Sequence, residues 1–425
     1  MNNVIIGNSA GGIAAVEAIR ERDKKVKITV ISEESYSNYS RPLISYLLGK
    51  KVNLEAMPYR EKDFYKDNKI ELILSKKAAK LDLKEKKVVL SDKKKIHFDK
   101  LLIATGGMPI IPEIEGCNLG GVFTFTKLVD TEKIKEYIEA NEVKDAVVIG
   151  GGLIGLKATE ALIELEIKVT IVELADRILS ATFDKKASTI IESALEKINC
   201  KLITNNTAIE IKGKKRGVKD VILKDKKKIS TKLVIVAIGV RPNIELVQGT
   251  PIKTNRGILV DEHMQTNIKN IYAAGDCCET KDLLLKINHP IAIWPVAIGE
   301  GKIAGFNMAG RKIEYKGSFA MNSVELCKIP TISVGESCLE GAGYQVIERF
   351  EQKKSMYKKI VLRNERIVGV IFVGDIERAG IYTGLIKDKV DTSSFKEHFL
   401  KEDFGLINLP KEYRKHLVEG EAATI

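Results

Sequence analysis

The stretch that decides the fold is Val4-Ile5-Ile6-Gly7-Asn8-Ser9-Ala10-Gly11-Gly12, an apolar strand that runs into a glycine-rich turn. The residues after it read as a helix, and Glu33 closes the next strand. The pattern recurs in Val147-Val148-Ile149-Gly150-Gly151-Gly152-Leu153-Ile154-Gly155, followed in the same way by Glu173. One such turn is a weak signal. Two of them, each in strand–turn–helix–strand–acid context, predict two dinucleotide sites and therefore electron transfer between cofactors.

The bulk properties are those of a globular enzyme. The chain has 425 residues, 44% hydrophobic and 30% charged, so we expect two or three domains with substantial cores. The longest apolar runs, such as residues 233–238, are strand-length and fall far short of the roughly 20 residues that span a bilayer. The first strand begins so early that no room is left for a signal peptide. We therefore expect a cytoplasmic protein with no membrane contact.

The charge balance is basic, with a formal net charge of +12. The lysine runs at residues 93–95 and 226–228 alternate with acids and lack interleaved aromatic residues, so nucleic-acid binding is not expected. Two interpretations remain: a compositional bias toward lysine and isoleucine, or a positive face that steers an acidic protein partner. The six cysteines and five histidines lie at no metal-ligand spacing, so no metal site is expected.

Each residue type in the first turn suits a phosphate site. Gly7 allows the tight bend, and Gly12 allows the helix to pack closely on the strand. Ser9 replaces the middle glycine with a small residue that can donate a hydrogen bond. The helix that opens at Ala10 presents unpaired backbone N–H groups to a pyrophosphate. Glu33 is placed to accept both hydroxyls of an adenosine ribose.

The second turn keeps all three glycines, Gly150, Gly152 and Gly155. Glu173 follows at about the spacing of 20 residues expected for the acid that binds the ribose. A carboxylate there accepts a free 2′-hydroxyl and repels a 2′-phosphate, which favours NADH over NADPH. Arg177 leaves tolerance of the phosphate open.

Two strand ends complete the pattern. Thr105-Gly106 ends a strand of the first unit, so its backbone can run under a bound nucleotide. Gly275-Asp276 follows the apolar strand at residues 271–274, and Asp276 is predicted to meet a ribitol hydroxyl or a phosphate-side oxygen. Considered alone, each motif is explained equally well as a cofactor contact or as an ordinary turn at the end of a strand. Together with the two glycine turns they indicate cofactor contacts.

On these motifs, with Ala237-Ile238-Gly239, the chain resembles the FAD-dependent pyridine nucleotide–disulfide oxidoreductase family over essentially its whole length. The segment Tyr39-Ser40-Arg41-Pro42-Leu43-Ile44-Ser45 resembles the branch with rubredoxin and ferredoxin reductases and the flavin portion of nitrite reductases. Residues 373–380 resemble flavoproteins that exchange electrons between NAD(H) and iron–sulfur proteins, including those partnered with carbon monoxide dehydrogenase.

The resemblance implies an α/β fold with two Rossmann-like dinucleotide-binding domains, the NAD domain inserted in the FAD domain, and a C-terminal α+β domain. We expect the FAD domain at 1–120 and 245–314 and the NAD domain at 121–244. Residues 315–425 would form a C-terminal domain for interfaces and partners.

The resemblance also implies the site residues. The backbone of Ala79 would meet the adenine, Arg41 the pyrophosphate, and Trp294 the pyrimidine edge of the flavin, although core packing is the alternative for Trp294. The residues expected to contact FAD are Gly7, Ser9, Ala10, Gly11, Gly12, Glu33, Arg41, Pro42, Ala79, Ala104, Thr105, Gly106, Gly275, Asp276, Trp294 and Pro295. Those expected to contact NAD(H) are Gly150, Gly152, Leu153, Ile154, Gly155, Glu173 and Gly239.

The sequence departs from the family at two places. It has no cysteine between Met1 and Pro112, so disulfide reduction and cysteine-based peroxidase chemistry lack their nucleophile. Cys277 and Cys278 should lead away from the reacting face. Relatives also place a lysine near the flavin, paired with a glutamate on the helix after the second turn, where this chain has Tyr46 and Lys157. Losing both partners leaves no unpaired buried charge, although Lys157 as a solvated helix residue is the alternative.

Without a nucleophile, hydride transfer would stop at the flavin, and no catalytic residue of the protein is expected. We therefore predict a FAD-dependent NADH:acceptor oxidoreductase that passes single electrons to or from a ferredoxin-like or rubredoxin iron–sulfur protein. A carbon monoxide dehydrogenase-linked carrier falls in this partner class, and a homodimer is left open. The alternatives are a peroxide-forming NADH oxidase and a flavin-bound docking subunit or redox sensor.

Overall fold

The computed structural model describes residues 1–214 and 217–414. The chain forms two compact units. The first unit comprises Met1–Ala175 and Asn199–Phe319, and the second comprises Asp176–Ile198 and the chain from Ala320 onward. No helix within the described ranges is both long and apolar enough to cross a membrane.

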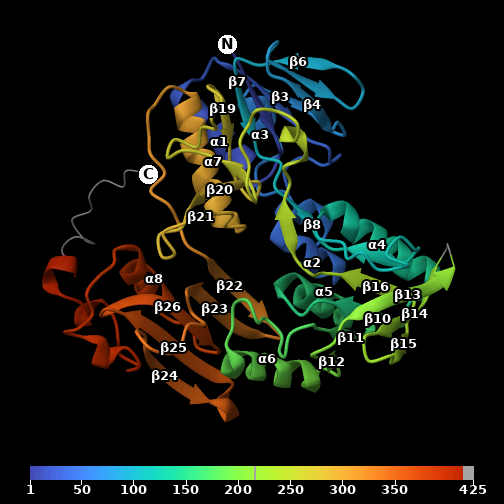
Figure 1. Ribbon diagram of the computed structural model, residues 1–425, viewed down its shortest axis with the longest axis vertical. Helices are drawn as coiled ribbons and strands as arrows, with labels where there is room; N and C mark the ends of the chain where they lie inside the picture. Colours follow the sequence, from blue (N-terminus) through green and yellow to red (C-terminus); the bar gives the residue numbers. More distant parts are fainter. Residues whose placement is uncertain (215–216, 415–425) are drawn as a thin grey trace. The chain divides into compact units, whose positions relative to one another are not determined.

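The N-terminal sheet of the first unit has five parallel strands, and it contains the first glycine turn (Figure 1). Apolar β-branched residues run through its central strands, where Val4 pairs with Thr29 on one side and Leu101 on the other. These strands are buried on both faces, as expected for a parallel sheet. In spatial order the strands are β19 (Ile271–Ala273), β7 (Lys100–Ile103), β1 (Asn2–Ile6), β2 (Lys27–Ile31) and β3 (Ile70–Ile73).

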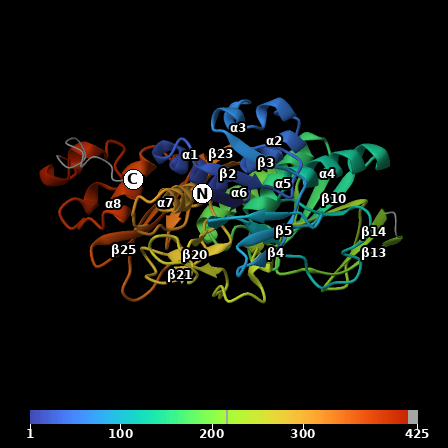
Figure 2. The ribbon, with the colours of Figure 1, turned by 90° about the horizontal axis from the view of Figure 1, so that it is seen from above.

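The first unit holds a second five-stranded parallel sheet with the same arrangement. The second glycine turn follows its central strand, and helices α5 (Leu153–Glu164) and α4 (Leu128–Asn141) belong to it (Figure 2). In spatial order its strands are β9 (Val122–Thr124), β16 (Leu233–Val236), β10 (Asp145–Ile149), β11 (Lys168–Val172) and β12 (Lys201–Ile203). The two sheets therefore correspond strand for strand.

Smaller antiparallel sheets extend both halves of this unit. One consists of β4 (Ala78–Asp82), β5 (Lys87–Leu90) and β6 (Lys95–His97). The other consists of β13 (Ala208–Lys214), β14 (Gly217–Leu223) and β15 (Lys228–Ser230). Figures 1 and 2 show the two at separate places in the unit.

The second unit is built on a five-stranded antiparallel sheet. Helix α6 (Lys185–Lys197) packs on its central strands, and helix α8 (Ala379–Lys387) packs on β26. Lys359 is fully buried there and pairs with Asp184 (3.0 Å) at the start of α6. In spatial order the strands are β22 (Met321–Leu326), β23 (Ile329–Gly335), β26 (Arg366–Val373), β25 (Met356–Arg363) and β24 (Gln345–Glu351).

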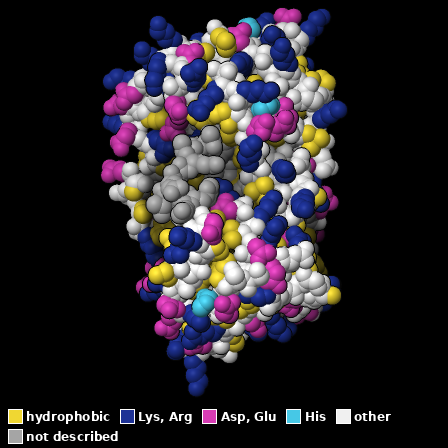
Figure 3. Space-filling model, turned by 90° about the vertical axis from the view of Figure 1, so that its left-hand side faces the viewer, with side chains coloured by type: hydrophobic (Ala, Val, Ile, Leu, Met, Phe, Trp, Pro, Cys, Tyr) yellow, Lys and Arg dark blue, Asp and Glu magenta, His cyan; other side chains and the backbone are white. Residues whose placement is uncertain are grey.

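The predicted fold class is confirmed: two Rossmann-like sheets are followed by a C-terminal antiparallel sheet with helices. The domain boundaries stay a prediction. The structure adds that residues 176–198, which lie inside the predicted NAD domain, pack with the C-terminal sheet. The end of the predicted C-terminal domain, residues 415–425, lies outside the described residues. On the face shown in Figure 3, Lys and Arg side chains are interspersed with Asp and Glu.

Candidate functional site

A cavity of about 430 Å³ lies at the carboxyl ends of the strands in the N-terminal sheet. Its walls come from the turns after β1, β2, β7 and β19 and from the start of the helix that follows each of β1 and β21 (Asn288–His289). This edge is where ligands bind in open parallel α/β sheets. The volume is typical of small-molecule sites.

The first glycine turn forms the floor of this cavity. Gly7 has a φ of +120°, and a Cβ there would lie 2.0 Å from the Ala104 carbonyl oxygen. A Cβ on Gly12 would lie 2.0 Å from the Gly7 carbonyl oxygen. Any larger residue would therefore push strand, turn and helix apart. Helix α1 (Ala10–Arg22) begins directly after Ser9 and has no acid in its first turn, so its N-terminus suits an anion.

A second helix N-terminus reaches the cavity because α7 (Trp294–Met308) packs very closely on α1. A Cβ on Gly301 would lie 2.1 Å from the Gly11 carbonyl oxygen, and one on Gly305 would lie 2.5 Å from that of Ala15. This approach brings Trp294 to the cavity wall, where its ring meets Tyr59 edge to face at 5.2 Å. Trp294 is therefore a wall residue as well as a packing residue.

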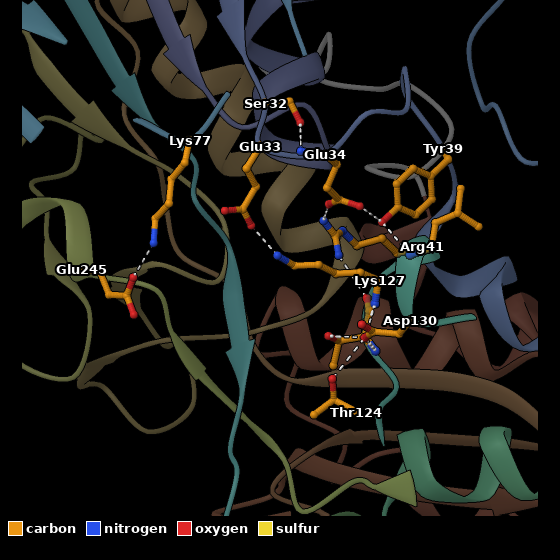
Figure 4. Close-up of polar contacts among 12 residues, drawn as sticks. Ser32, Glu33, Glu34, Tyr39, Arg41, Lys77, Thr124, Lys127, Asp130 and Glu245 are labelled. Atoms are coloured by element: carbon orange, nitrogen blue, oxygen red, sulfur yellow. Dashed lines mark hydrogen bonds and ion pairs between the residues drawn. The ribbon is translucent and has the colours of Figure 1, made fainter. Parts of the chain in front are cut away.

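Arg41 joins the cradle to the wall of the cavity (Figure 4). Its guanidinium pairs with Glu34 at 2.5 Å and donates to the Thr126 carbonyl at 3.0 Å and the Ser9 hydroxyl at 3.4 Å. Tyr39 donates its hydroxyl to the same Glu34 carboxylate at 2.7 Å. The cation is thus held beside the start of α1, where a pyrophosphate would need it.

Glu33 lines the cavity and pairs with Lys127 from the start of α4 (Figure 4). Burial acts to raise the pKa of the Glu33 carboxyl. The hydrogen bond from Lys127 and the charges of Lys127, Lys77 and Arg41 outweigh it and hold that pKa below its ordinary value. The ionised Glu33 carboxylate is therefore available for ribose hydroxyls. On another wall of the cavity Lys77 pairs with Glu245 at 3.0 Å.

Asp276 follows β19 and lines the cavity at the opposite end of the sheet edge from Glu33, and Glu300 on α7 contacts the turn that carries it. Burial raises the pKa of the Asp276 carboxyl, while the charge of Arg41 acts against it. The Glu300 carboxylate on α7 is buried and accepts the Gly275 backbone N–H at 2.7 Å and the Thr280 hydroxyl at 2.6 Å. Burial raises its pKa to about 7. Glu300 therefore fixes the turn that carries Asp276.

The two cysteines after Asp276 point into the protein. The Cys277 thiol donates to the carbonyls of Ile103 and Ala274, both at 3.4 Å, and burial raises its pKa to about 11. Burial and the neighbouring Glu300 carboxyl raise the pKa of Cys278 well above its ordinary value. Neither thiol lines the cavity, and no other described residue that lines it is a cysteine.

The structure places most of the predicted FAD residues around this one cavity. Gly12, Ala79 and Pro295 are the exceptions. Gly12 packs against the backbone of Gly7 on the side of the turn away from the cavity, and Pro295 is exposed. Ala79 lies at a register shift between Ala78 and Lys80 in β4, and the preceding residues Lys76, Lys77 and Ala78 line the wall. The residues that do line it are Gly7, Ser9, Ala10, Gly11, Glu33, Arg41, Pro42, Ala104, Thr105, Gly106, Gly275, Asp276 and Trp294.

The second glycine turn repeats the backbone geometry of the first. Gly150 has a φ of +108°, and a Cβ there would lie 2.4 Å from the Ala237 carbonyl oxygen. A Cβ on Gly155 would lie 2.0 Å from the Gly150 carbonyl oxygen. A Cβ on Gly152 would meet nothing within 4 Å, so the fold does not require glycine there. That open face at the start of α5 is where a pyrophosphate would lie.

Glu173 is fixed at this second turn. Its carboxylate accepts the Gly151 N–H at 2.5 Å and the Ala175 N–H at 2.7 Å. Ile154, at the start of α5, also lines the first cavity, so the second cradle borders the first. Gly239 has a φ of +115° after β16.

Tyr46 and Lys157, which stand at the two positions where the chain departs from the family, lie close together. The Lys157 ammonium stands 5.0 Å from the centre of the Tyr46 ring and forms an ion pair with Glu160 at 2.6 Å. Lys157 is therefore a partly buried, paired cation of α5. Tyr46 does not line the cavity.

Sequence reasoning missed five charged residues around the cavity. Glu34, Lys76 and Lys77 are adjacent to predicted elements, and the Glu33-Glu34 doublet was the available signal for the first of them. Lys127 and Glu245 reach the cavity from distant segments, and no local pattern marks them.

Two glycine cradles at the edges of two parallel sheets define an oxidoreductase that uses two dinucleotides. The profile of the family described as pyridine nucleotide-disulphide oxidoreductase matches residues 1–301, and the chain belongs to this family. The cofactors of the family are FAD and NAD(H), which the two cradles fit. A second profile, the rubredoxin NAD+ reductase C-terminal domain, matches residues 321–390.

The chain is similar to proteins named as reductases and to a subunit of a dehydrogenase. The chain is 31% identical to nitrite reductase [NAD(P)H] of Bacillus subtilis over 92% of its own length and 48% of that protein. It is 30% identical to the NADH-dependent phenylglyoxylate dehydrogenase subunit epsilon of Aromatoleum evansii, over 93% and 94% of the two chains. Among solved structures, a NAD-dependent persulfide reductase from A. fulgidus is 26% identical with a TM-score of 0.85, over 93% and 78%. The chain thus spans about half of the nitrite reductase and nearly all of the dehydrogenase subunit.

Proposed function

We propose that the chain is an NADH:acceptor oxidoreductase whose acceptor or donor is a small iron–sulfur protein of ferredoxin or rubredoxin type. The observation that carries this proposal is the composition of the first cavity. No thiol is present among the described residues that line it, and Cys277 and Cys278 are buried with raised pKa values. Electrons that reach this cavity therefore have no thiol to reduce and must pass to a separate partner.

The first cradle suits FAD. The N-terminus of α1, Ser9 and Arg41 form a donor set for the pyrophosphate, and Glu33 would accept the ribose hydroxyls. The backbone at Lys77–Ala78 would meet the adenine, and Asp276 the ribitol. Bound there, FAD supplies the ring that exchanges a hydride with NAD(H) and single electrons with a partner.

The second cradle suits NAD(H). Gly150, Gly152, Leu153 and Gly155 would surround its pyrophosphate, and Glu173 would bind the ribose. Ile154 and Gly239 would lie on the nicotinamide side. The contribution of Ile154 to the wall of the first cavity supports this, because hydride transfer needs only contact between the two cofactors.

Two observations support an iron–sulfur partner. The C-terminal residues 321–390 match the rubredoxin reductase C-terminal profile. The net charge of +12 would speed association with an acidic carrier, a class that includes a carbon monoxide dehydrogenase-linked carrier.

A second candidate function is that of an electron-input subunit of a larger enzyme. It is favoured by the relatives, since one is named as a subunit and this chain spans 48% of another. Such a chain would pass electrons to one partner enzyme rather than to a free carrier.

The decisive experiment is anaerobic reduction of the yellow protein by NADH, followed by rapid mixing with oxidised ferredoxin or rubredoxin. We expect reoxidation of the flavin at a rate that rises with carrier concentration and falls with added salt. Transfer to neither carrier would favour the subunit function. Rapid oxygen uptake with NADH alone, in air, would instead support a peroxide-forming NADH oxidase and contradict the proposal.

A further inference from the structure

A cation from the second sheet reaches the adenosine end of the first cavity. Lys127 lies between β9 and α4, and β9 pairs with β16 of the second sheet. The Lys127 ammonium nevertheless pairs with Glu33, which follows β2 of the N-terminal sheet (Figure 4). The lysine side chain is 28% exposed and lines the cavity.

Helix formation does not explain a lysine at this position. Lys127 is the N-cap of α4, where Ser, Thr, Asp or Asn is preferred, and its side chain makes no capping hydrogen bond. A positive charge at a helix N-terminus also opposes the helix dipole. Asp130 satisfies the helix end instead, by accepting the backbone N–H groups of Thr126 at 2.8 Å and Lys127 at 3.1 Å. Residues that break a local rule in this way tend to mark functional sites.

The backbone that carries Lys127 is fixed to the cavity wall. The Leu128 N–H donates to the Tyr39 hydroxyl at 3.2 Å, and the Thr126 carbonyl accepts from Arg41 at 3.0 Å. Because this corner is already held, the lysine loses less conformational freedom on reaching Glu33 than a lysine on a free loop would.

We propose that Lys127 is a further FAD-binding residue, which fixes the Glu33 carboxylate for the adenosine ribose and thereby selects FAD over FMN. The proposal rests on the assignment of FAD to the first cradle. An unpaired carboxylate would repel the incoming pyrophosphate and could rotate freely. Paired with Lys127, Glu33 adds no net charge and presents its remaining oxygen lone pairs to the ribose hydroxyls. FMN lacks the adenosine half and does not reach this pair.

The test is titration of the apoprotein with flavins, followed by flavin fluorescence. We expect Lys127→Ala to weaken FAD binding about tenfold, since the interaction is charge-assisted but partly exposed. FMN binding should be unchanged, and ADP, which carries the adenosine half alone, should compete with FAD about tenfold less well. Lys127→Arg should restore most of the FAD affinity.

Lys51 provides a matched control. Its ion pair with Glu164 (2.8 Å) also joins the two halves of the unit, and neither residue lines the cavity. Lys51→Ala should leave FAD affinity unchanged, and Lys127→Ala should cost little once Glu33→Gln is present. Equal losses for FAD and FMN, an unchanged FAD affinity, or a full loss in the Glu33→Gln background would overturn the proposal. The assay contains neither NADH nor an acceptor, so its outcome is independent of the proposed electron transfer.

Discussion

The two glycine cradles share one backbone design and differ in how each treats its acid. In both, the first glycine is pressed against a carbonyl of the neighbouring strand, Ala104 in one and Ala237 in the other. In both, its N–H donates to the last residue of the next strand at 2.9 Å. Glu173 follows that strand directly, whereas Glu33 comes one residue later relative to its own strand end at Ile31.

That shift of one residue gives the acids different partners. The Glu173 carboxylate accepts two backbone N–H groups, one from Gly151 in its own cradle and one from Ala175 two residues further along the chain. Glu33 instead pairs with Lys127, which comes from the other sheet. Among the described residues, Glu173 therefore has no side-chain cation as a hydrogen-bond partner, whereas the charge of Glu33 is offset by Lys127. We therefore expect the partner of the acid, more than the glycines, to influence which dinucleotide each cradle prefers.

The shared backbone design gives the largest expected effect. Gly7→Ala and Gly150→Ala should each lower the free energy of unfolding by about 3–5 kcal/mol, because each adds a Cβ against a backbone carbonyl at positive φ. Gly152→Ala should change it by less than about 0.5 kcal/mol, since its Cβ meets nothing. Urea unfolding of the three apoproteins measures this.

The same Gly152→Ala variant should bind NADH more weakly, since its Cβ would occupy the space assigned to the pyrophosphate. NADH titration by fluorescence measures that loss. Full NADH affinity in a stable Gly152→Ala protein would contradict the location of the second site. Normal stability of Gly7→Ala would show that the turn can relax and that its glycine is retained for another reason.

The next largest expected effect is the pH dependence of stability that comes from the buried Glu300. It extends the comparison of the two sheets to the edge strands β19 and β9. β19 and β9 occupy equivalent places, and each ends in a turn held by a carboxylate, Glu300 in one and Asp130 in the other. Because the Glu300 pKa rises from 4.5 to about 7, the folded state keeps a proton that the unfolded state has released. Stability therefore falls as the pH rises between these values, by about 3 kcal/mol in total.

Glu300→Gln isolates this contribution. Glutamine can still accept the Gly275 N–H, and its amide can donate to the Thr280 hydroxyl. The variant should therefore gain about 3 kcal/mol relative to the native protein between pH 4.5 and pH 8, as measured by urea unfolding at each pH. Asp276 and Cys278 also lie near Glu300 and are common to both proteins. A stability difference that does not change with pH would show that Glu300 is ionised throughout.

Much of this comparison could be predicted from the sequence because it depends on local constraints. Glycines at positive φ and a strand–turn–helix pattern are encoded within about ten residues, and the structure has both predicted strand–turn–helix units. Asp276 was predicted to line the FAD site, and the structure places it at the wall of the first cavity.

The remaining features depend on tertiary packing or on register. Ala78 rather than Ala79 lines the wall, next to a register shift in β4, and a one-residue shift of this kind leaves no sequence signal. Lys127 meets Glu33 only because Tyr39 and Arg41 hold the start of α4 against the cavity. Residues 176–198 fall within the predicted NAD domain, whereas α6 packs on the C-terminal sheet, because an amphipathic pattern does not reveal which sheet a helix will cover.

The smallest expected effect concerns the choice between NADH and NADPH at the second cradle. Glu173→Ala should reduce the preference for NADH about tenfold, because the carboxylate fixed at the glycine turn no longer repels a 2′-phosphate. The ratio of kcat/KM values for the two nucleotides with an artificial acceptor measures this. Glu173→Gln should retain part of the NADH affinity through one acceptor oxygen while losing the repulsion.

The matched variant in the first cradle is Glu33→Gln, which should leave the NADH/NADPH ratio unchanged. An unchanged ratio in both Glu173 variants would remove that carboxylate from nucleotide selection and leave it as a brace for Gly151 and Ala175. A ratio that changes with Glu173→Ala and not with Glu173→Gln would show that shape matters more than charge. If both Glu173 variants lose the preference for NADH, the negative charge of Glu173 selects against the 2′-phosphate of NADPH. Glu33 cannot select in this way, because Lys127 offsets its charge.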